Sequence, residues 1–193
     1  MVIKNWKYDE MLSEKNATRL GYAFLYYALA HSQFIQVAEV NNQAVGIIVG
    51  NTQAIPLKSK VNFLKMLKYG FPLFFSKEGR IILKVYKTTV STNRKLFNQV
   101  KHHSFDGEVA LFAVSEEVQG LGIGSNLFDS FLHYLKEEHV NSFFLFTDTS
   151  CNYGFYDHKK LERIAQKKQR ITEPLDKKME FYIYKGIREN LGK

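Results

Sequence analysis

The chain of 193 residues has 45% hydrophobic residues, 15% aromatic residues, three prolines and a formal net charge of +8. These values predict one globular domain over residues 1–193 and exclude a disordered or low-complexity chain. A single cysteine, Cys151, excludes an internal disulfide framework, and the charged N-terminus does not resemble a signal peptide, so we expect a cytoplasmic protein. No apolar run approaches the roughly 20 residues needed to cross a bilayer, so we expect no membrane partner.

Positive charge is concentrated between Pro56 and Ser104, a segment with eleven basic residues and one acidic residue, Glu78. The resulting +10 exceeds the net charge of the whole chain. Such a segment attracts a polyanion or an anionic cofactor, although solvated outer faces of helices give the same composition. A basic nucleic-acid-binding protein is therefore one alternative, but nucleic acid is the less favoured partner.

The N-terminal part predicts a helix and then a hairpin. From Tyr8 to about His31 apolar residues recur at helical spacing, with a break expected near Gly21. Residues 34–40 and 44–50 are apolar runs on either side of a short polar turn, which is typical of an antiparallel hairpin. The core candidates of the helix are Met11, Leu12, Leu20, Phe24, Leu25 and Leu29.

Residues 54–104 predict two or three helices inserted between strands. Leu57, Val61, Leu64 and Leu67 keep helical spacing. The step at residues 70–72, Gly-Phe-Pro, breaks this pattern, and a second helix follows that ends near Val100.

The C-terminal part alternates strands with helices. Residues 107–114 predict a strand, 124 to about 139 an amphipathic helix and 142–147 another strand. A right-handed crossover of these lengths places the two strands parallel in one sheet. A short helix at about 152–159 and strands near 162–167 and 179–185 complete an α/β chain.

The stretch AVSEEVQGLGIGSNLF, residues 113–128, places three glycines between a strand and a helix. Glycines let backbone N–H groups point into one concavity, and the helix N-terminus adds partial positive charge, so the site suits a phosphate. Neither the Walker loop nor the dinucleotide fingerprint fits, because Ser125 stands where each requires another residue.

The same stretch fits the pattern Gln/Arg-x-x-Gly-x-Gly/Ala through Gln119, Gly122 and Gly124. Here the chain resembles the GCN5-related N-acetyltransferases, known as the GNAT superfamily. Asn152 and Tyr156 in CNYGFYDHKKLERI resemble a second signature of that family. The resemblance covers residues 107–185 well, whereas Lys160-Leu161 replaces the usual Gly-Phe pair and residues 2–6 are the only candidate for a first strand.

The resemblance implies a mixed, mostly antiparallel α/β sheet with a parallel strand-helix-strand site for acetyl-CoA, its helical insertion at about 54–104 falling between the third and fourth strands. The activity it implies is acetyl transfer from acetyl-CoA, the cosubstrate, to a primary amine of a small molecule or peptide. No metal is expected. A CoA-binding module without turnover is an alternative, and a homodimer stays open.

The resemblance also implies roles for individual residues. Tyr156 would be the acid, and Glu108 the base, with Asp148 or a water as alternatives. Asn152 would hold the cofactor arm; its simpler interpretation is a helix N-cap, which would not exclude that role. The residues expected to bind the cofactor are Phe112, Ala113, Val114, Gln119, Gly120, Leu121, Gly122, Ile123, Gly124, Ser125 and Asn152. Among the glycines, the family pattern leaves Gly120 free.

Overall fold

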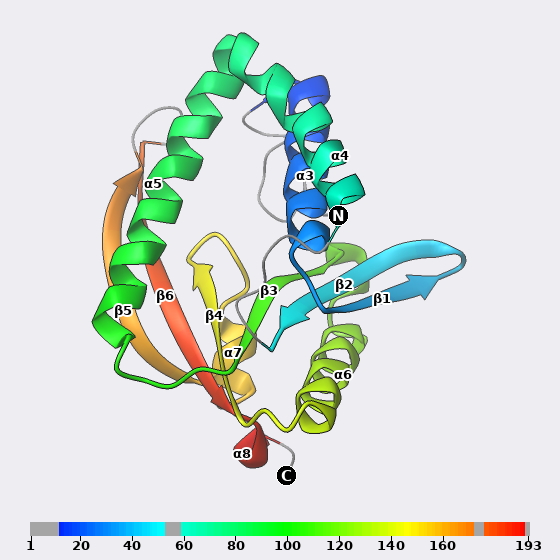
Figure 1. Ribbon diagram of the computed structural model, residues 1–193, viewed down its shortest axis with the longest axis vertical. Helices are drawn as coiled ribbons and strands as arrows, with labels where there is room; N and C mark the ends of the chain where they lie inside the picture. The colour runs from blue at the N-terminus through cyan, green and yellow to red at the C-terminus, as the bar shows by residue number, and fades with distance from the viewer. Residues whose placement is uncertain (1–11, 53–58, 172–175, 192–193) are drawn as a thin grey trace.

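The computed structural model describes residues 12–52, 59–171 and 176–191 (Figure 1). The predicted first strand at residues 2–6, Met11 and Leu57 lie outside the described residues. The elements in chain order are α3 (Glu14–Ala30), β1 (Phe34–Val40), β2 (Gln43–Asn51), α4 (Lys60–Gly70), the 3-10 helix η1 (Phe71–Phe75), α5 (Lys77–Val100), β3 (Gly107–Val114), the 3-10 helix η2 (Glu116–Val118), α6 (Ile123–Glu137), β4 (Ser142–Asp148), α7 (Gly154–His158), β5 (Glu162–Ile171), β6 (Lys177–Ile187) and α8 (Arg188–Leu191).

The described strands form one six-stranded sheet in the order β1-β2-β3-β4-β6-β5. Only β3 and β4 run parallel; the other neighbouring pairs are antiparallel. The helix α6 connects β3 to β4, as a crossover between parallel strands requires. The predicted mixed, mostly antiparallel α/β fold is confirmed, and so is the parallel strand-helix-strand unit.

The hairpin of β1 and β2 turns on Asn41 and Asn42, which have φ angles of 51° and 61°. Asparagine tolerates left-handed backbone better than most residues, and two such residues in succession match the twist of the flanking strands. This local chemistry explains why the hairpin was predictable from a few residues.

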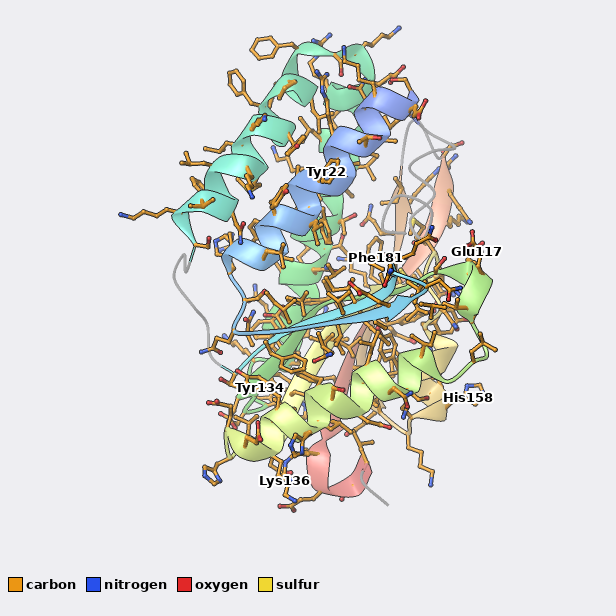
Figure 2. The ribbon with its side chains drawn as sticks, turned by 90° about the vertical axis from the view of Figure 1, so that its right-hand side faces the viewer. Tyr22, Glu117, Tyr134, Lys136, His158 and Phe181 are labelled. Carbon is orange, nitrogen blue, oxygen red and sulfur yellow. The ribbon has the colours of Figure 1, made fainter. Side chains whose placement is uncertain are left out.

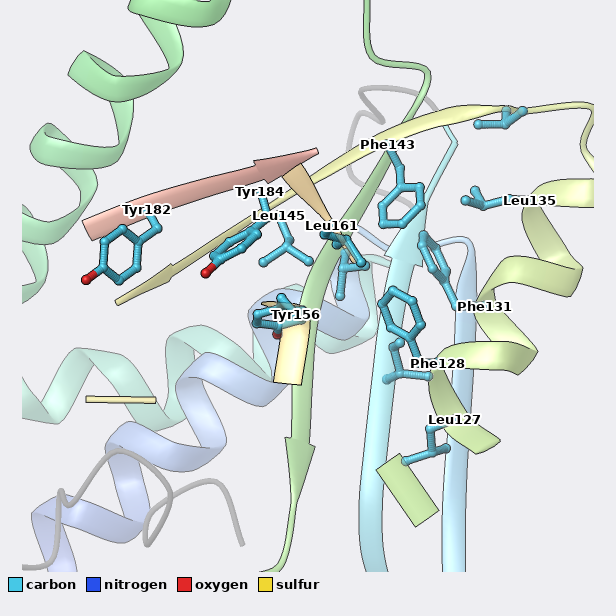
Figure 3. Packing of buried hydrophobic residues seen from close by; sticks show 13 residues of the cluster. Leu127, Phe128, Phe131, Leu135, Phe143, Leu145, Tyr156, Leu161, Tyr182 and Tyr184 are labelled. Atoms are coloured by element: carbon cyan, nitrogen blue, oxygen red, sulfur yellow. The ribbon is translucent and has the colours of Figure 1, made fainter. Parts of the chain in front are cut away.

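Helices cover both faces of the sheet. On one face, α6 and α7 cover a core that is rich in aromatic side chains, including Phe128, Phe131, Phe143 and Tyr184 (Figure 3). On the other face, α3 packs on β2 and β3 through Ala28. The helix α5 packs on β5 and β6 of the same face. The parallel strands β3 and β4 are therefore covered by helices on both faces of the sheet.

The prediction of a helix break near Gly21 is wrong, because α3 runs without interruption from Glu14 to Ala30. Gly21 is buried within the helix, and the adjacent Tyr22 stacks on Tyr69 of α4 with ring centroids 4.8 Å apart. Packing against a neighbouring helix thus offsets the low helix propensity of glycine. The predicted core residues Leu12 and Leu20 are buried, whereas Phe24, Leu25 and Leu29 are partly buried.

The segment between β2 and β3 contains α4, η1 and α5, which confirms the predicted helical insertion. The hydroxyl oxygens of Ser59 and Ser76 accept hydrogen bonds from the backbone N–H groups of Asn62 and Gly79, and so cap α4 and α5. Glu78, the acidic residue of this segment, accepts hydrogen bonds from Ser13 and thereby ties the start of α5 to the start of α3. Within the described ranges, no helix is long and apolar enough to cross a membrane.

Candidate cofactor and active site

A groove of about 480 Å³ opens where β3 and β4 separate, beside the start of α6 and α7. Its wall comprises the end of β3, the glycine loop and the segment that follows β4. The lining residues are Phe112, Ala113, Val114, Glu116, Val118, Gln119, Gly120, Gly122, Gly124, Ser125, Ser150, Cys151, Asn152, Phe155 and Tyr156.

The glycine loop contributes left-handed backbone and a helix N-terminus to the groove. Gly120 and Gly122 have φ angles of 81° and 79°, a conformation that costs a residue with a side chain roughly 1–2 kcal/mol. Gly122 is the N-cap of α6, and its carbonyl oxygen accepts a hydrogen bond from the N–H of Asn126. The N–H groups of the first turn of α6, before Asn126, have no partner within the helix, so they are available to an anion.

The parallel pairing of β3 with β4 is short. It joins Gly107 to Phe143 and ends at the pair of Val109 with Leu145. A register shift between β2 and β3 adds an extra residue to β3 directly after Val109. The edge of β3 at Phe112 and Ala113 therefore faces the groove rather than β4, and an extended ligand can lie alongside it.

Tyr156 projects from α7 into the deep end of the groove and is only 8% exposed. Its ring lies 6.5 Å from that of Phe112. It also lies 5.5 Å from the ring of Tyr184, which Figure 3 shows beside it. Burial raises the pKa of Tyr156 far above its usual value of 10, with smaller contributions from Cys151 and Tyr184. The hydroxyl therefore stays protonated at neutral pH and is a hydrogen-bond donor.

The helix α7 is fastened to the sheet by a polar network next to Tyr156. The hydroxyl of Tyr184 donates a hydrogen bond of 2.7 Å to Asp157, and Arg163 donates to the oxygen of Tyr184 at 2.7 Å and 3.0 Å. The guanidinium also lies 4.2 Å from the ring centroid of Tyr182, and burial raises the pKa of Tyr184 to about 12. These contacts fix the position of α7 and hence of Tyr156.

Glu108 lies on β3 before the strands separate, opposite Asn51 of β2 and Phe144 of β4. Burial raises the pKa of its carboxyl group. In the described part of the chain, no hydrogen bond reaches this carboxylate. A carboxylate in this environment is more basic than an exposed one, which suits proton abstraction.

Asp148, the other candidate base, ends β4. Burial raises its pKa as well, although two hydrogen bonds from Ser150 and the charge of Lys177 oppose this effect. The N–H of Ser150 donates to Asp148 at 2.7 Å, and its hydroxyl donates to the same oxygen. This carboxylate thus already accepts the hydrogen bonds that stabilise the turn after β4.

Most of the predicted binding residues meet in the groove, but three predicted site residues do not line it. Leu121 is 70% exposed, Ile123 packs against the α6 core, and Glu108 lies outside the lining. Leu121 and Ile123 can contribute backbone only. Sequence reasoning missed Glu116, Val118, Ser150, Cys151 and Phe155. Of these, Phe155 carried a signal, because it is the aromatic residue directly before Tyr156.

The simpler interpretation of Asn152 as a helix cap is wrong. The N-cap of α7 is Tyr153, without a side-chain hydrogen bond, and Asn152 lines the groove. His102 and His103 stack with ring centroids 4.4 Å apart, and Lys185 lies 3.4 Å from His103. Among the described residues, no three His, Cys, Asp or Glu side chains gather as a metal site would require.

The fold resembles that of a solved structure described as an acetyltransferase. A protein from Desulfovibrio desulfuricans assigned to the GNAT family aligns with a TM-score of 0.52 and 11% identity, over 97% of this chain and 90% of its own. An Elizabethkingia anophelis GNAT acetyltransferase with acetyl-CoA bound gives 0.46 and 14%, over 84% and 80%. An N-acetyltransferase from Staphylococcus aureus Mu50 gives 0.46 and 13%, over 80% of this chain and 67% of its own.

The family is defined by the sequence itself. The model of the Acetyltransferase (GNAT) family matches residues 2–159, which is most of the chain. The chain therefore belongs to the GNAT family of acyltransferases, whose cosubstrate is acetyl-CoA. No curated protein matches this sequence.

Proposed function

We propose that this protein transfers the acetyl group of acetyl-CoA to a primary amine of a small molecule or a peptide, and that residues 1–193 act as one domain. The observation that carries the proposal is the groove, in which the glycine loop, the separated edge of β3 and Tyr156 line one cavity. The family supplies the acetyl-CoA chemistry. The groove suggests which residues of this chain perform it.

The pyrophosphate of acetyl-CoA binds backbone N–H groups of the segment from Gln119 to Ser125, in which those of Gln119 and Leu121 also donate to the carbonyl oxygens of Glu116 and Val118. The left-handed glycines of this loop and the N-terminus of α6 support this placement, because both direct N–H groups and partial positive charge toward one point. Leu121 and Ile123 contribute only their backbone. Asn152, on the opposite wall, hydrogen-bonds the cofactor arm.

The pantetheine arm extends along β3 from Val114 to Phe112 as an added strand. The shortness of the β3–β4 pairing supports this path, since the arm occupies the space that opens between the two strands. The thioester then lies near Tyr156. A backbone N–H near Phe112 hydrogen-bonds the thioester oxygen as negative charge develops on it.

Glu108 accepts a proton from the attacking amine, directly or through a water. Its raised pKa and the absence of a hydrogen bond to its carboxylate in the described chain favour it over Asp148, which Ser150 already engages. The neutral amine then attacks the thioester carbon and the carbon–sulfur bond breaks. The second proton of the nitrogen passes through solvent to the departing thiolate, so the products are the amide and the CoA thiol.

Tyr156 stabilises the departing thiolate. Its pKa lies far above that of a thiol, so complete transfer of its proton is uphill, and a hydrogen bond from the hydroxyl to sulfur carries most of the effect. The buried position of the ring holds this donor in place.

The test is a CoA-release assay over a panel of amines that includes peptides with free N-termini and lysine side chains. The wild-type protein should release CoA with at least one amine class, and Tyr156→Phe should lower kcat about 100-fold while leaving the Kd for acetyl-CoA unchanged. If acetyl-CoA binds but no amine is acetylated, the protein is a CoA-binding module. If Tyr156→Phe keeps its kcat, Tyr156 is not the acid.

A further inference from the structure

The helical insertion exposes apolar side chains along α4 and η1. Six apolar residues of α4 and η1 are exposed to solvent, with Leu64 63% and Phe75 72% exposed. We call this set the apolar tip: Val61, Leu64, Leu67, Phe71, Phe74 and Phe75. Single exposed apolar residues are common, but a contiguous group on a folded element marks an interaction surface.

The apolar tip is presented by an ordered turn rather than by loose chain. Leu73, in the middle of η1, is 1% exposed and packs in the cluster that joins α3 to α5. A Cβ at Gly79 of α5 would clash with the carbonyl oxygen of Leu73, so η1 lies directly on the α5 backbone. This packing turns Leu73 inward and holds Phe71, Phe74 and Phe75 outward.

Basic side chains border the apolar tip. Lys68 and Lys77 are exposed on either side of η1, and Arg80 donates a hydrogen bond to the carbonyl oxygen of Phe74. The acidic residue nearest in sequence, Glu78, is exposed and keeps its negative charge, and it accepts hydrogen bonds from Ser13 and Asn16. The insertion extends away from the sheet, and Glu117, near the glycine loop, lies elsewhere on the molecule (Figure 2).

The positive charge of the insertion distinguishes between the partners that could cover the apolar tip. Two copies meeting through this end would bring together two segments of about +10 each, which repel. Single-stranded nucleic acid requires a basic groove with open stacking faces. Here Phe71 and Phe75 pack edge to face, 5.1 Å apart, and the tip otherwise has one aromatic ring, Phe74, beside three aliphatic side chains. A surface that is both apolar and anionic complements the tip better.

We propose that the apolar tip docks the protein onto the surface of an anionic lipid bilayer. Phe71, Phe74 and Phe75 enter the headgroup region, and Lys68, Lys77 and Arg80 contact lipid phosphates. The contact is with the bilayer surface, so it is consistent with the absence of a spanning helix among the described residues. It does not depend on the cofactor groove.

The test is vesicle flotation of the full chain at low salt, with vesicles of phosphatidylcholine alone or mixed with phosphatidylglycerol. The wild-type protein should float with the mixed vesicles only, and added salt should release it. The triple variant Phe71→Ser/Phe74→Ser/Phe75→Ser should lower the partition coefficient about tenfold or more. The matched control Ile35→Thr/Val37→Thr/Val40→Thr, which removes three exposed apolar side chains from β1, should leave it unchanged.

A second pair of variants tests the charge separately from folding. Lys68→Glu/Lys77→Glu should reduce flotation about tenfold, whereas Lys136→Glu/Lys160→Glu, with the same net charge, should not. Residue 77 begins α5, where a negative charge is favourable, whereas Lys68 is in the last turn of α4, where it is unfavourable, so the two effects oppose each other; circular dichroism of the variant checks that it folds. Loss of flotation in both pairs, or flotation that survives the triple phenylalanine variant, would overturn the proposal. So would self-association or single-stranded RNA binding through the tip without vesicle binding.

Discussion

The helices α4 and α6 both carry apolar residues at helical spacing, yet their apolar faces have opposite environments. In α6, Leu127, Phe128, Phe131 and Leu135 are at most 3% exposed, because the sheet covers them. In α4 no residue is buried, and Leu64 lies in solvent. Helical periodicity therefore predicts a helix, but it does not predict whether the rest of the fold covers its apolar face.

The largest expected effect is a difference in stability between a substitution in α6 and one in α4. Phe131→Ala should lower the free energy of unfolding by about 3–5 kcal/mol, because the ring is fully buried and packs against Phe143 with centroids 5.4 Å apart. Leu64→Ala should change it by no more than about 0.5 kcal/mol. Urea titration of both variants measures the difference. Equal losses would show that α4 is covered by another part of the chain.

The next largest effect is expected for Glu108, whose substitution should change both the activity and the pH dependence of the stability. Glu108→Gln should lower kcat/KM about 100-fold. The activity of the wild-type protein should rise with pH, with a midpoint above 4.5, and the variant should lack this rise. Between 4.5 and the raised pKa, the folded protein holds the proton that the unfolded chain has lost. The free energy of unfolding of the wild-type protein therefore falls as pH rises through this window.

Because Gln does not titrate, the Glu108→Gln variant should be more stable than the wild-type protein above that window. Unfolding titrations at pH values on either side of it give the comparison. A variant that retains full activity would assign the base to Asp148 or to a water. A variant that loses activity and stability together would mean that Glu108 has a structural role instead.

A smaller effect is expected at Lys160, where the family usually has glycine. Lys160 has a φ angle of 59°, a left-handed conformation that glycine adopts without strain. Lys160→Gly should raise the free energy of unfolding by about 1 kcal/mol through relief of left-handed strain. The neighbour Lys159, with a φ angle of −75°, is the matched control, and Lys159→Gly should not stabilise. Thermal unfolding distinguishes the two.

Much of the fold was predictable, because its signals are local. Asn41 and Asn42 indicated the hairpin, and the alternation of β3 followed by the periodicity of α6 indicated the parallel unit. The break expected at Gly21 failed, because helix propensity is weak beside the packing of α3 on α4. The exposure of the apolar tip was equally beyond a local pattern, since it depends on what the rest of the chain covers.

The site was predictable where backbone geometry and sequence coincide. Gly122 and Gly124 indicated the loop, and Asn152 and Tyr156 indicated the opposite wall. The pattern left Gly120 free, yet its φ angle of 81° makes the same conformational demand as that of Gly122. Ser150 and Cys151 carry no recognisable spacing, because they reach the groove only through the turn after β4.

The most direct test of the central claim is a calorimetric titration with acetyl-CoA of the wild-type protein and Gly124→Val. Gly124 has ordinary helical backbone, and a side chain there would meet Phe112, Val114 and Phe155, which all line the groove. We predict that the wild-type protein binds acetyl-CoA and that the variant binds it at least about tenfold more weakly, with a similar free energy of unfolding. Equal affinities in the two proteins, or no binding by the wild-type protein, would contradict the assignment of this groove to acetyl-CoA.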